Sequence, residues 1–231
     1  MAFQGYTQQT VDFMWGIRFN NERGWFLEHK DDYINTFLTP TRELGEQVYD
    51  AVHALLPDEP LMLKVSRIYR DARRLFGRGP YKDHLWWCIR TGDKDWTGRP
   101  TFWFELGPDY YSFGLGFWSP AAALMETYRK QIDAHPEELS KLVRQFNRQS
   151  VFTLDGPEYA RSKGQTSDLL RPWYQKKSLS LRWEGPLDER IFTSALAEDI
   201  IAGFKTLIPF YHYFNKLVAL TPRQERRGEE A

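Results

Sequence analysis

The sequence predicts an α+β fold, in which a mostly antiparallel sheet of about four to six strands packs against amino-terminal and carboxyl-terminal helices. Three observations predict it. Apolar residues recur at helical spacing near both ends of the chain, aromatic and β-branched residues are concentrated in the middle, and the turns between the middle segments are too short for parallel crossovers. The 231 residues, 42% hydrophobic and 16% aromatic, can fill one core. We therefore expect a single domain over residues 1–222 and a charged, disordered tail over residues 223–231.

The amino-terminal part of the chain is expected to form three helices. Between them, Asn20 can end the first helix, Asn21 can cap the second, and Pro40 interrupts the pattern before the third. Apolar side chains recur three and four residues apart in the segments 11–17, 25–33 and 44–55.

After Pro60 the pattern changes to that of strands. Turn residues such as GRGP, GDKDWTGRP and GPD separate segments that are rich in aromatic and β-branched side chains. Because so few residues join these segments, they should pair as an antiparallel sheet. The four segments are LMLKVSRIYR (61–70), HLWWCIRTG (84–92), TFWFELG (101–107) and YYSFGLGFW (110–118).

The remaining chain is expected to return to helices around one further strand. Ser119 can cap a helix that has Pro120 at its first position, and Pro209 should divide the last helical stretch. The expected elements are helices at 119–133 and 136–149, a short alternating strand at 176–185, and closing helices at 188–208 and 209–220.

Composition excludes several classes of protein. The 31 basic and 31 acidic residues balance, which argues against a protein that coats nucleic acid through bulk charge. The single cysteine, Cys88, excludes a disulfide framework and a cysteine zinc cluster, and we expect a buried thiol. No apolar run approaches the roughly 18 to 20 residues of a membrane span, and the first residues lack a signal peptide's pattern. We therefore expect a cytoplasmic protein with no membrane partner, no cofactor and no metal, and the oligomeric state stays open.

One segment concentrates positive charge in this neutral chain. RIYRDARRLFGRGPYKD, from residue 67 to 83, holds five arginines and one lysine against two aspartates. If residues 61–73 form one extended strand, alternate side chains share a face that begins apolar and ends with Arg67, Asp71 and Arg73. On that face Asp71 would hold a guanidinium in a fixed orientation.

The turn that follows would add Tyr81 and Lys82 to the same site. Arginine suits phosphate and carboxylate oxygens because its planar fork donates two parallel hydrogen bonds. The segment therefore indicates a pocket for a small anionic ligand, with or without catalysis. The competing interpretation is that these cations form exposed ion pairs, which are common and individually weak.

Two motifs in the sequence, NNERGWFLEHKDDY and SRIYRDARRLFGRGPYKDHL, resemble the paired signature of domain-of-unknown-function family 2461 of bacteria and fungi. The resemblance covers most of the chain, although Gly24 and the segment RLFGRG depart from the usual pattern. It implies an α+β fold and no established activity. The matching positions are Asn20, Asn21, Arg23, Trp25, Phe26, His29 and Lys30 in the first motif and Arg67, Arg70, Asp71, Arg73, Pro80, Tyr81 and Lys82 in the second.

The two motifs together define the predicted ligand site. If they meet in space, cations from both would surround one depression, and Asp71 would orient one of the arginines. The predicted ligand-binding residues are Arg67, Arg70, Asp71, Arg73, Tyr81, Lys82, His29 and Lys30.

A nucleic-acid or protein interaction platform is the alternative hypothesis. In it, Tyr69, Tyr81, Trp86 and Trp96 would be exposed beside the arginines and would stack on bases or grip a partner. The neutral net charge makes nucleic acid the less expected partner. The two hypotheses differ in ligand size and in salt response, because affinity for oligonucleotides falls steeply as salt rises.

A weaker signal is the glycine pair before the predicted helix at residue 119. Gly114 and Gly116 could leave room for an anion at the helix start, but they more often relieve crowding beside large rings such as Trp86, Trp87 or Trp103.

Overall fold

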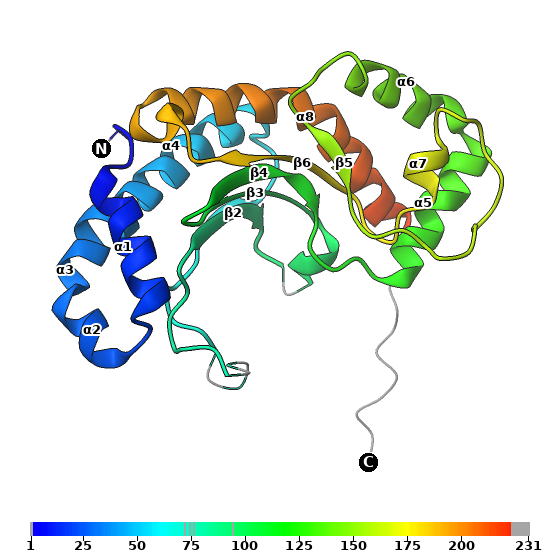
Figure 1. The fold of residues 1–231 in the computed structure, drawn as a ribbon. Coiled ribbons are helices and arrows are strands. Elements are labelled where there is room, and N and C mark those ends of the chain that lie inside the picture. Colours follow the sequence, from blue (N-terminus) through cyan, green and yellow to red (C-terminus); the bar gives the residue numbers. More distant parts are fainter. Residues whose placement is uncertain (1, 72, 74, 76, 94, 223–231) are drawn as a thin grey trace.

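The computed structural model describes residues 2–71, 73, 75, 77–93 and 95–222. Helices form both ends of the chain and a sheet lies between them, so the predicted α+β class is confirmed (Figure 1). Buried apolar side chains from the helices and the sheet form one cluster. The segment 223–231, for which the sequence predicts disorder, lies outside the described residues.

The amino-terminal helices are more continuous than expected. Pro40 does not separate them, because it lies in the first turn of the last one, where its missing N–H is tolerated. A proline at this position cannot donate to the Thr36 carbonyl, which instead accepts the Thr10 hydroxyl at 2.6 Å. The free carbonyl thus ties two helices together. The elements are α1 (Gln8–Phe19), α2 (Arg23–Glu28), α3 (Lys30–Asp32), the π-helix η1 (Tyr33–Leu38) and α4 (Thr39–Leu55).

Two predictions for the carboxyl-terminal helices are wrong. The helix expected at Ser119 begins only at Ala122, because Ala121 still has an extended backbone, and the Ser119 N–H bonds the Thr97 carbonyl at 2.8 Å. The two closing helices form one, which runs through Pro209 because proline removes a single hydrogen bond while Leu207 and Phe210 stay buried on either side. The elements are η3 (Trp96–Gly98), α5 (Ala122–Ala134), α6 (Pro136–Phe146), α7 (Arg171–Tyr174), η4 (Glu189–Phe192) and α8 (Ala195–Leu220).

The sheet has the order β1-β2-β3-β4-β6-β5, and every neighbouring pair is antiparallel. The first four strands are neighbours in the sheet in the same order as in the sequence, which confirms the predicted antiparallel sheet of four consecutive strands. The predicted strand near residue 180 pairs with β4, and a short strand that the sequence did not indicate lies beyond it. The strands are β1 (Leu61–Val65), β2 (Leu85–Thr91), β3 (Pro100–Leu106), β4 (Tyr110–Phe117), β5 (Thr153–Asp155) and β6 (Ser180–Pro186).

The first strand is shorter than the sequence predicts. β1 ends at Val65, so the extended course expected from residue 61 to 73 is wrong beyond that point. The Ser66 N–H still bonds the Trp86 carbonyl at 2.8 Å, but β2 begins only at Leu85 and offers no partner further along. The chain therefore leaves the sheet.

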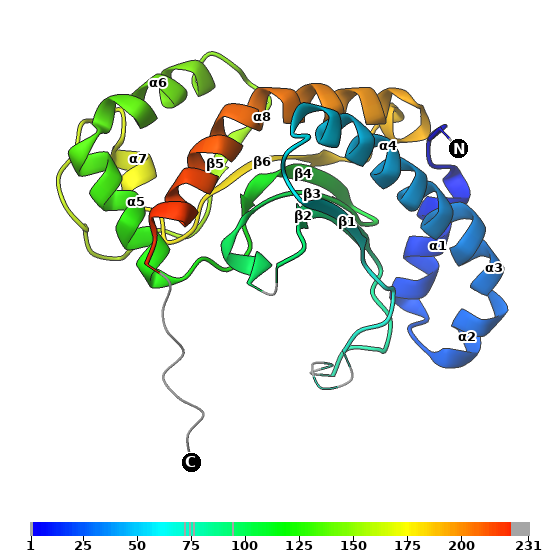
Figure 2. The ribbon, with the colours of Figure 1, turned by 180° about the vertical axis from the view of Figure 1, so that it is seen from behind.

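The two faces of the sheet have different surroundings. Trp87, Phe104 and Phe113 point to one face, and Phe204 of α8 packs on Trp87 and Phe113, with its ring centroid 6.3 Å from that of Trp87. Helices α4 and α8 cover this face (Figures 1 and 2). No helix of the described chain lies across the opposite face, which is the concave side of the curved sheet. Nor does any described helix combine the length and apolar character needed to cross a membrane.

Candidate functional site

The described residues between 66 and 84, which we call the basic ribbon, leave the sheet between β1 and β2, and their two ends pair with each other (Figure 2). The Arg70 N–H bonds the Pro80 carbonyl at 2.8 Å, and the Lys82 N–H bonds the Ile68 carbonyl at 2.7 Å. Successive side chains of a paired ribbon point to opposite sides, so these bonds decide which way each cation faces.

The amino-terminal motif clamps the basic ribbon. The Asn21 side-chain amide donates to the Tyr81 carbonyl, and its oxygen accepts the Tyr81 N–H, both at 2.9 Å. Phe26 stacks on the Tyr81 ring with a centroid distance of 4.3 Å. A Cβ at Gly79 would overlap the Asn21 side chain, so glycine leaves room for this clamp. The two motifs of the sequence therefore meet in space.

Asp83 is the centre of an ion-pair network at the base of the ribbon. Its carboxylate lies 2.9 Å from His84 Nδ1, 2.6 Å from Arg18 Nε and 4.0 Å from Arg70 Nη2. Arg18 also pairs with Asp109 at 2.5 Å. The hydrogen bond with His84, and then that with Arg18, hold the pKa of Asp83 well below its usual range. The network joins α1, the ribbon and the turn between β3 and β4.

The arginines of the predicted site do not gather at one point. Asp71 holds the Arg73 guanidinium through two hydrogen bonds of 3.1 and 2.9 Å, but 88% of the Arg73 side chain is exposed. Arg67 is also exposed. Arg70 is half-buried, and its Nε donates to the Tyr81 carbonyl at 2.8 Å. Arg70 and Arg73 thus both have partners within the ribbon. The pair of Arg73 with Asp71 is an exposed ion pair, as the competing interpretation of the charged segment expects.

The other predicted residues separate further. The Tyr81 side chain is buried, so the expectation that it is exposed for stacking is wrong, because Phe26 covers it. His29 stacks on Trp25 with a centroid distance of 3.9 Å, and Lys30 is exposed. Among the described residues, no hydrogen bond, ion pair or ring contact joins His29 or Lys30 to the ribbon.

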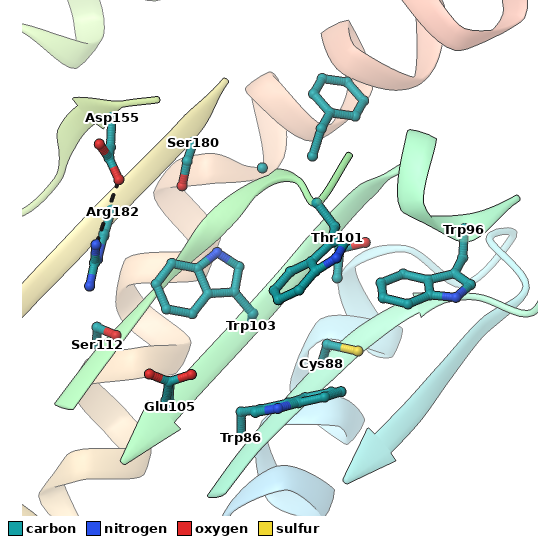
Figure 3. A pocket seen from close by; sticks show the side chains of 13 residues that line it. Trp86, Cys88, Trp96, Thr101, Trp103, Glu105, Ser112, Asp155, Ser180 and Arg182 are labelled. Carbon is teal, nitrogen blue, oxygen red and sulfur yellow. Dashed lines mark ion pairs between the residues drawn. The ribbon is translucent and has the colours of Figure 1, made fainter. Parts of the chain in front are cut away.

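A pocket on the open sheet face lies beside the ribbon, and sequence reasoning missed it. Its cavity volume is about 410 Å³, and its walls come mainly from β2, β3, β4 and β6 (Figure 3). None of the predicted ligand-binding residues lines it. Its lining includes Trp86, Cys88, Trp103, Glu105, Ser112 and Arg182.

Three tryptophans of this pocket each have a cation near the ring. A cation over an aromatic face is attracted by the ring quadrupole. The pocket therefore combines a large aromatic area with three cations at its margins and two carboxylates, Glu105 and Asp155, in its lining. The pairs are Lys82 with Trp86 (5.6 Å to the ring centroid), Arg90 with Trp96 (4.7 Å) and Arg182 with Trp103 (5.9 Å).

Two polar atoms of the pocket lack a partner. The Ser112 Oγ and the Arg182 Nε are buried and make no hydrogen bond within the described chain. The terminal nitrogens of Arg182 pair with Asp155 at 3.7 Å and with Glu184. Buried polar atoms in folded proteins nearly always have a partner, so these two atoms are places where a bound molecule could donate or accept.

Lys82 stands where the ribbon meets the pocket. It is half-buried, with its Nζ over the Trp86 ring. Burial lowers the pKa of Lys82 to about 8, with further lowering by Arg70 and Arg67 that Glu105 opposes. This lysine is therefore the one predicted site residue that faces the pocket's aromatic lining.

We expect Lys82→Met to raise the free energy of unfolding at pH 7 by about 1 kcal/mol, after allowance for solvent screening. The folded-state pKa of about 8 lies below the unfolded value of roughly 10.4, so the penalty is complete below pH 8 and is relieved as pH rises toward 10. Urea unfolding at pH 7 and pH 10 measures both quantities. Lys64→Met, at an exposed lysine of the same sheet, should change stability by less than about 0.5 kcal/mol. A Lys82→Met variant less stable than wild type at pH 7 would contradict the assigned burial.

Cys88 is buried as the sequence predicts, and it lies within the pocket. Burial raises the pKa of its thiol to about 11, so it is protonated at neutral pH. Over the described residues, no group of three or more His, Cys, Asp or Glu side chains is placed to hold a metal ion.

The fold and the site define an α+β protein with an aromatic pocket on an open sheet face and a basic ribbon at its edge. The model of a family described as "Conserved hypothetical protein (DUF2461)" matches residues 9–213 of the chain. The protein belongs to this family, as the resemblance of its two motifs implied. A comparison with curated proteins finds no match.

Proposed function

We propose that the pocket on the open sheet face binds a small molecule with a flat ring and an anionic group, either a phosphate or a carboxylate. The observation that carries the proposal is the cation beside each of three tryptophans around a cavity of about 410 Å³. Ligand pockets are typically about 300 to 1,000 Å³, largely aromatic or apolar, with a few polar groups that fix orientation.

The ring and the anionic group would occupy different parts of the site. Trp86 and Trp103 project into the pocket from neighbouring strands and offer stacking surfaces (Figure 3). Lys82 and Arg67 lie at the Trp86 end, where Arg67 contributes to the positive potential around Lys82. We therefore place the anionic group at the ribbon and the ring over the sheet. This differs from the site predicted from the charge pattern alone, which lay within the basic segment.

The platform hypothesis has one observation in its favour. Trp118 at the pocket margin is 74% exposed and Tyr69 on the ribbon is 54% exposed. This alternative predicts that oligonucleotides, and not small anions, bind and that salt abolishes binding.

We expect phenyl phosphate to raise the melting temperature more than inorganic phosphate or benzyl alcohol does, because only phenyl phosphate uses both the rings and the cations. A ligand at one hundred times its Kd stabilises the folded state by about 2.7 kcal/mol. For a chain of this length that is about 5 to 11 °C, which a thermal-shift assay resolves readily.

Two variants test whether the ligand that raises the melting temperature binds in the pocket. Trp103→Leu removes a stacking surface and should abolish it, whereas Arg73→Ala, at an exposed arginine paired with Asp71, should leave it unchanged. An equal shift in Trp103→Leu and wild type would place the ligand elsewhere. A shift given only by a short oligothymidylate, and lost in salt, would favour the platform.

A further inference from the structure

We infer that the side-chain amine of Lys82 is a nucleophile that forms an imine with an aldehyde or ketone held against Trp86. The inference rests on the proposed function, since the carbonyl compound would occupy the same pocket. It adds a covalent step to that function and names carbonyl compounds as the class of substrate.

The backbone that carries the amine is held on both sides. The Lys82 backbone N–H bonds the Ile68 carbonyl at 2.7 Å. The preceding residue, Tyr81, is clamped by the amino-terminal motif, and the following residue, Asp83, is the centre of the ion-pair network. A nucleophile on a backbone held in this way loses less freedom on reaction than one on an unanchored segment, which favours its attack on a bound molecule. The Nζ lies 5.6 Å from the Trp86 ring centroid, so a carbonyl compound stacked on that ring would be beside it.

Burial, and after it the cations that face Lys82, favour the free amine. Arg70 and Arg67 act from the ribbon, and Glu105 of β3 is the acidic group that opposes them. With a pKa of about 8, about one-tenth of the amine is uncharged at pH 7, whereas an ordinary lysine of pKa about 10.4 is uncharged to about 0.04%. Desolvation beside other cations is a known means of activating a lysine for imine formation.

Glu105 can carry the protons that imine formation moves. It lines the pocket and interacts with Lys82 electrostatically. The Tyr110 hydroxyl donates a hydrogen bond to it, and burial raises the pKa of Tyr110, so that hydroxyl keeps its proton at neutral pH. The Glu105 carboxylate is therefore oriented and free to accept a proton on its remaining lone pairs.

The reaction balances without an oxidant or a reductant. The Lys82 lone pair forms the C–N bond while the carbonyl π electrons move to oxygen, and one proton passes from nitrogen to that oxygen through Glu105. The nitrogen lone pair of the resulting carbinolamine then forms the C=N bond and expels the hydroxyl group. The Glu105 carboxylate takes the iminium proton and passes it to the departing hydroxyl, which leaves as water, so the sum is amine plus carbonyl giving imine plus water and Glu105 ends as the carboxylate it began as.

Reductive alkylation of the full-length protein tests the amine itself. Acetaldehyde with cyanoborohydride, followed by peptide mass spectrometry, gives the rate at each lysine from pH 6 to pH 10. At pH 7 we expect Lys82 to react at least about tenfold faster than Lys64, an exposed lysine on the same sheet, and to reach half its maximal rate near pH 8. In Glu105→Gln the midpoint should move to lower pH and the maximal rate should fall. Equal rates and profiles at Lys82 and Lys64 would overturn the inference.

A matched pair of compounds separates this inference from the proposed function. Pyridoxal 5′-phosphate has a ring, a phosphate and an aldehyde, whereas pyridoxine 5′-phosphate lacks only the aldehyde. Borohydride should trap the first compound on Lys82 and not in Lys82→Arg, and the second should compete. If pyridoxine 5′-phosphate or phenyl phosphate shifts the melting temperature while trapping is spread over exposed lysines, the imine is wrong and the binding site stands. If no ring phosphate shifts it, the proposed function is wrong, and the acetaldehyde profile still decides the reactivity of Lys82.

Discussion

Gly114→Ala is expected to lower the free energy of unfolding by about 3 kcal/mol, equivalent to about 6 to 12 °C in melting temperature. Gly114 lies in β4 and pairs with Arg182 of β6. An added Cβ would overlap the Leu181 carbonyl oxygen and lie 3.1 Å from its carbonyl carbon. These are backbone atoms, so the whole neighbouring strand must move to make room. Urea unfolding followed by circular dichroism measures the loss.

Gly24→Ala is the matched control, because the same methyl group is added where nothing lies within 4 Å. Gly24 is exposed in α2, and alanine is the better helix former, so stability should stay the same or rise by up to about 1 kcal/mol. The two substitutions should therefore have opposite signs. A loss below about 1 kcal/mol in Gly114→Ala would mean that β4 and β6 separate without strain.

The close approach of β4 and β6 at these glycines also shapes the pocket. Gly116 lines it, and a Cβ there would lie 2.5 Å from the Leu179 carbonyl oxygen of the segment leading into β6. The sequence predicts that these glycines relieve crowding, and they do. The crowding comes from the backbone beside β4, however, and not from tryptophan rings as expected. Glycines at 114 and 116 let the two strands approach closely and keep the floor of the pocket free of side chains.

Local patterns were enough to predict most of the fold. The order of helices and strands, and the antiparallel meander, follow from residue spacing and from turns that are too short for crossovers. The failures arose where a distant partner decides the outcome. β1 stops at Val65 because β2 begins at Leu85, and the three residues of β5 pair only because β6 lies beside them. No window of sequence contains either fact.

The candidate site shows the same limit. Charge clustering located the ribbon, and Lys82 belongs to it, but the pocket on the sheet was missed. Alternation predicts that Trp86 and Trp87 lie on opposite faces, and it does not say which face a helix will cover. Trp87 lies fully buried beneath α8, while its neighbour Trp86 lines the pocket. The signal that could have found the pocket is a large ring at both alternating positions of one strand, since a sheet covered on one side buries only one of the two sets.

The second large effect is expected at the base of the ribbon, where Asp83→Asn should lower the free energy of unfolding by about 2 kcal/mol at pH 7. The Asp83 side chain is 18% exposed and accepts hydrogen bonds from Arg18 and His84. An amide has the same shape but cannot accept both with full strength, and it leaves the Arg18 guanidinium without a buried counter-charge. Chemical denaturation of both proteins at pH 7 measures the difference.

The pH dependence of that difference identifies the charge as its cause. The folded state holds the pKa of Asp83 well below the value of about 3.9 expected in the unfolded chain, so its stabilisation is complete above about pH 5 and is lost as pH falls through and below 4. The curves for wild type and Asp83→Asn should therefore converge in acid. Asp109→Asn removes the other carboxylate that Arg18 contacts, but Asp109 is 53% exposed, and the expected loss is below about 0.5 kcal/mol at any pH. Equal losses in the two variants, or curves that stay parallel down to pH 2, would contradict the assignment of Asp83 as the residue that anchors the ribbon and the backbone beside Lys82.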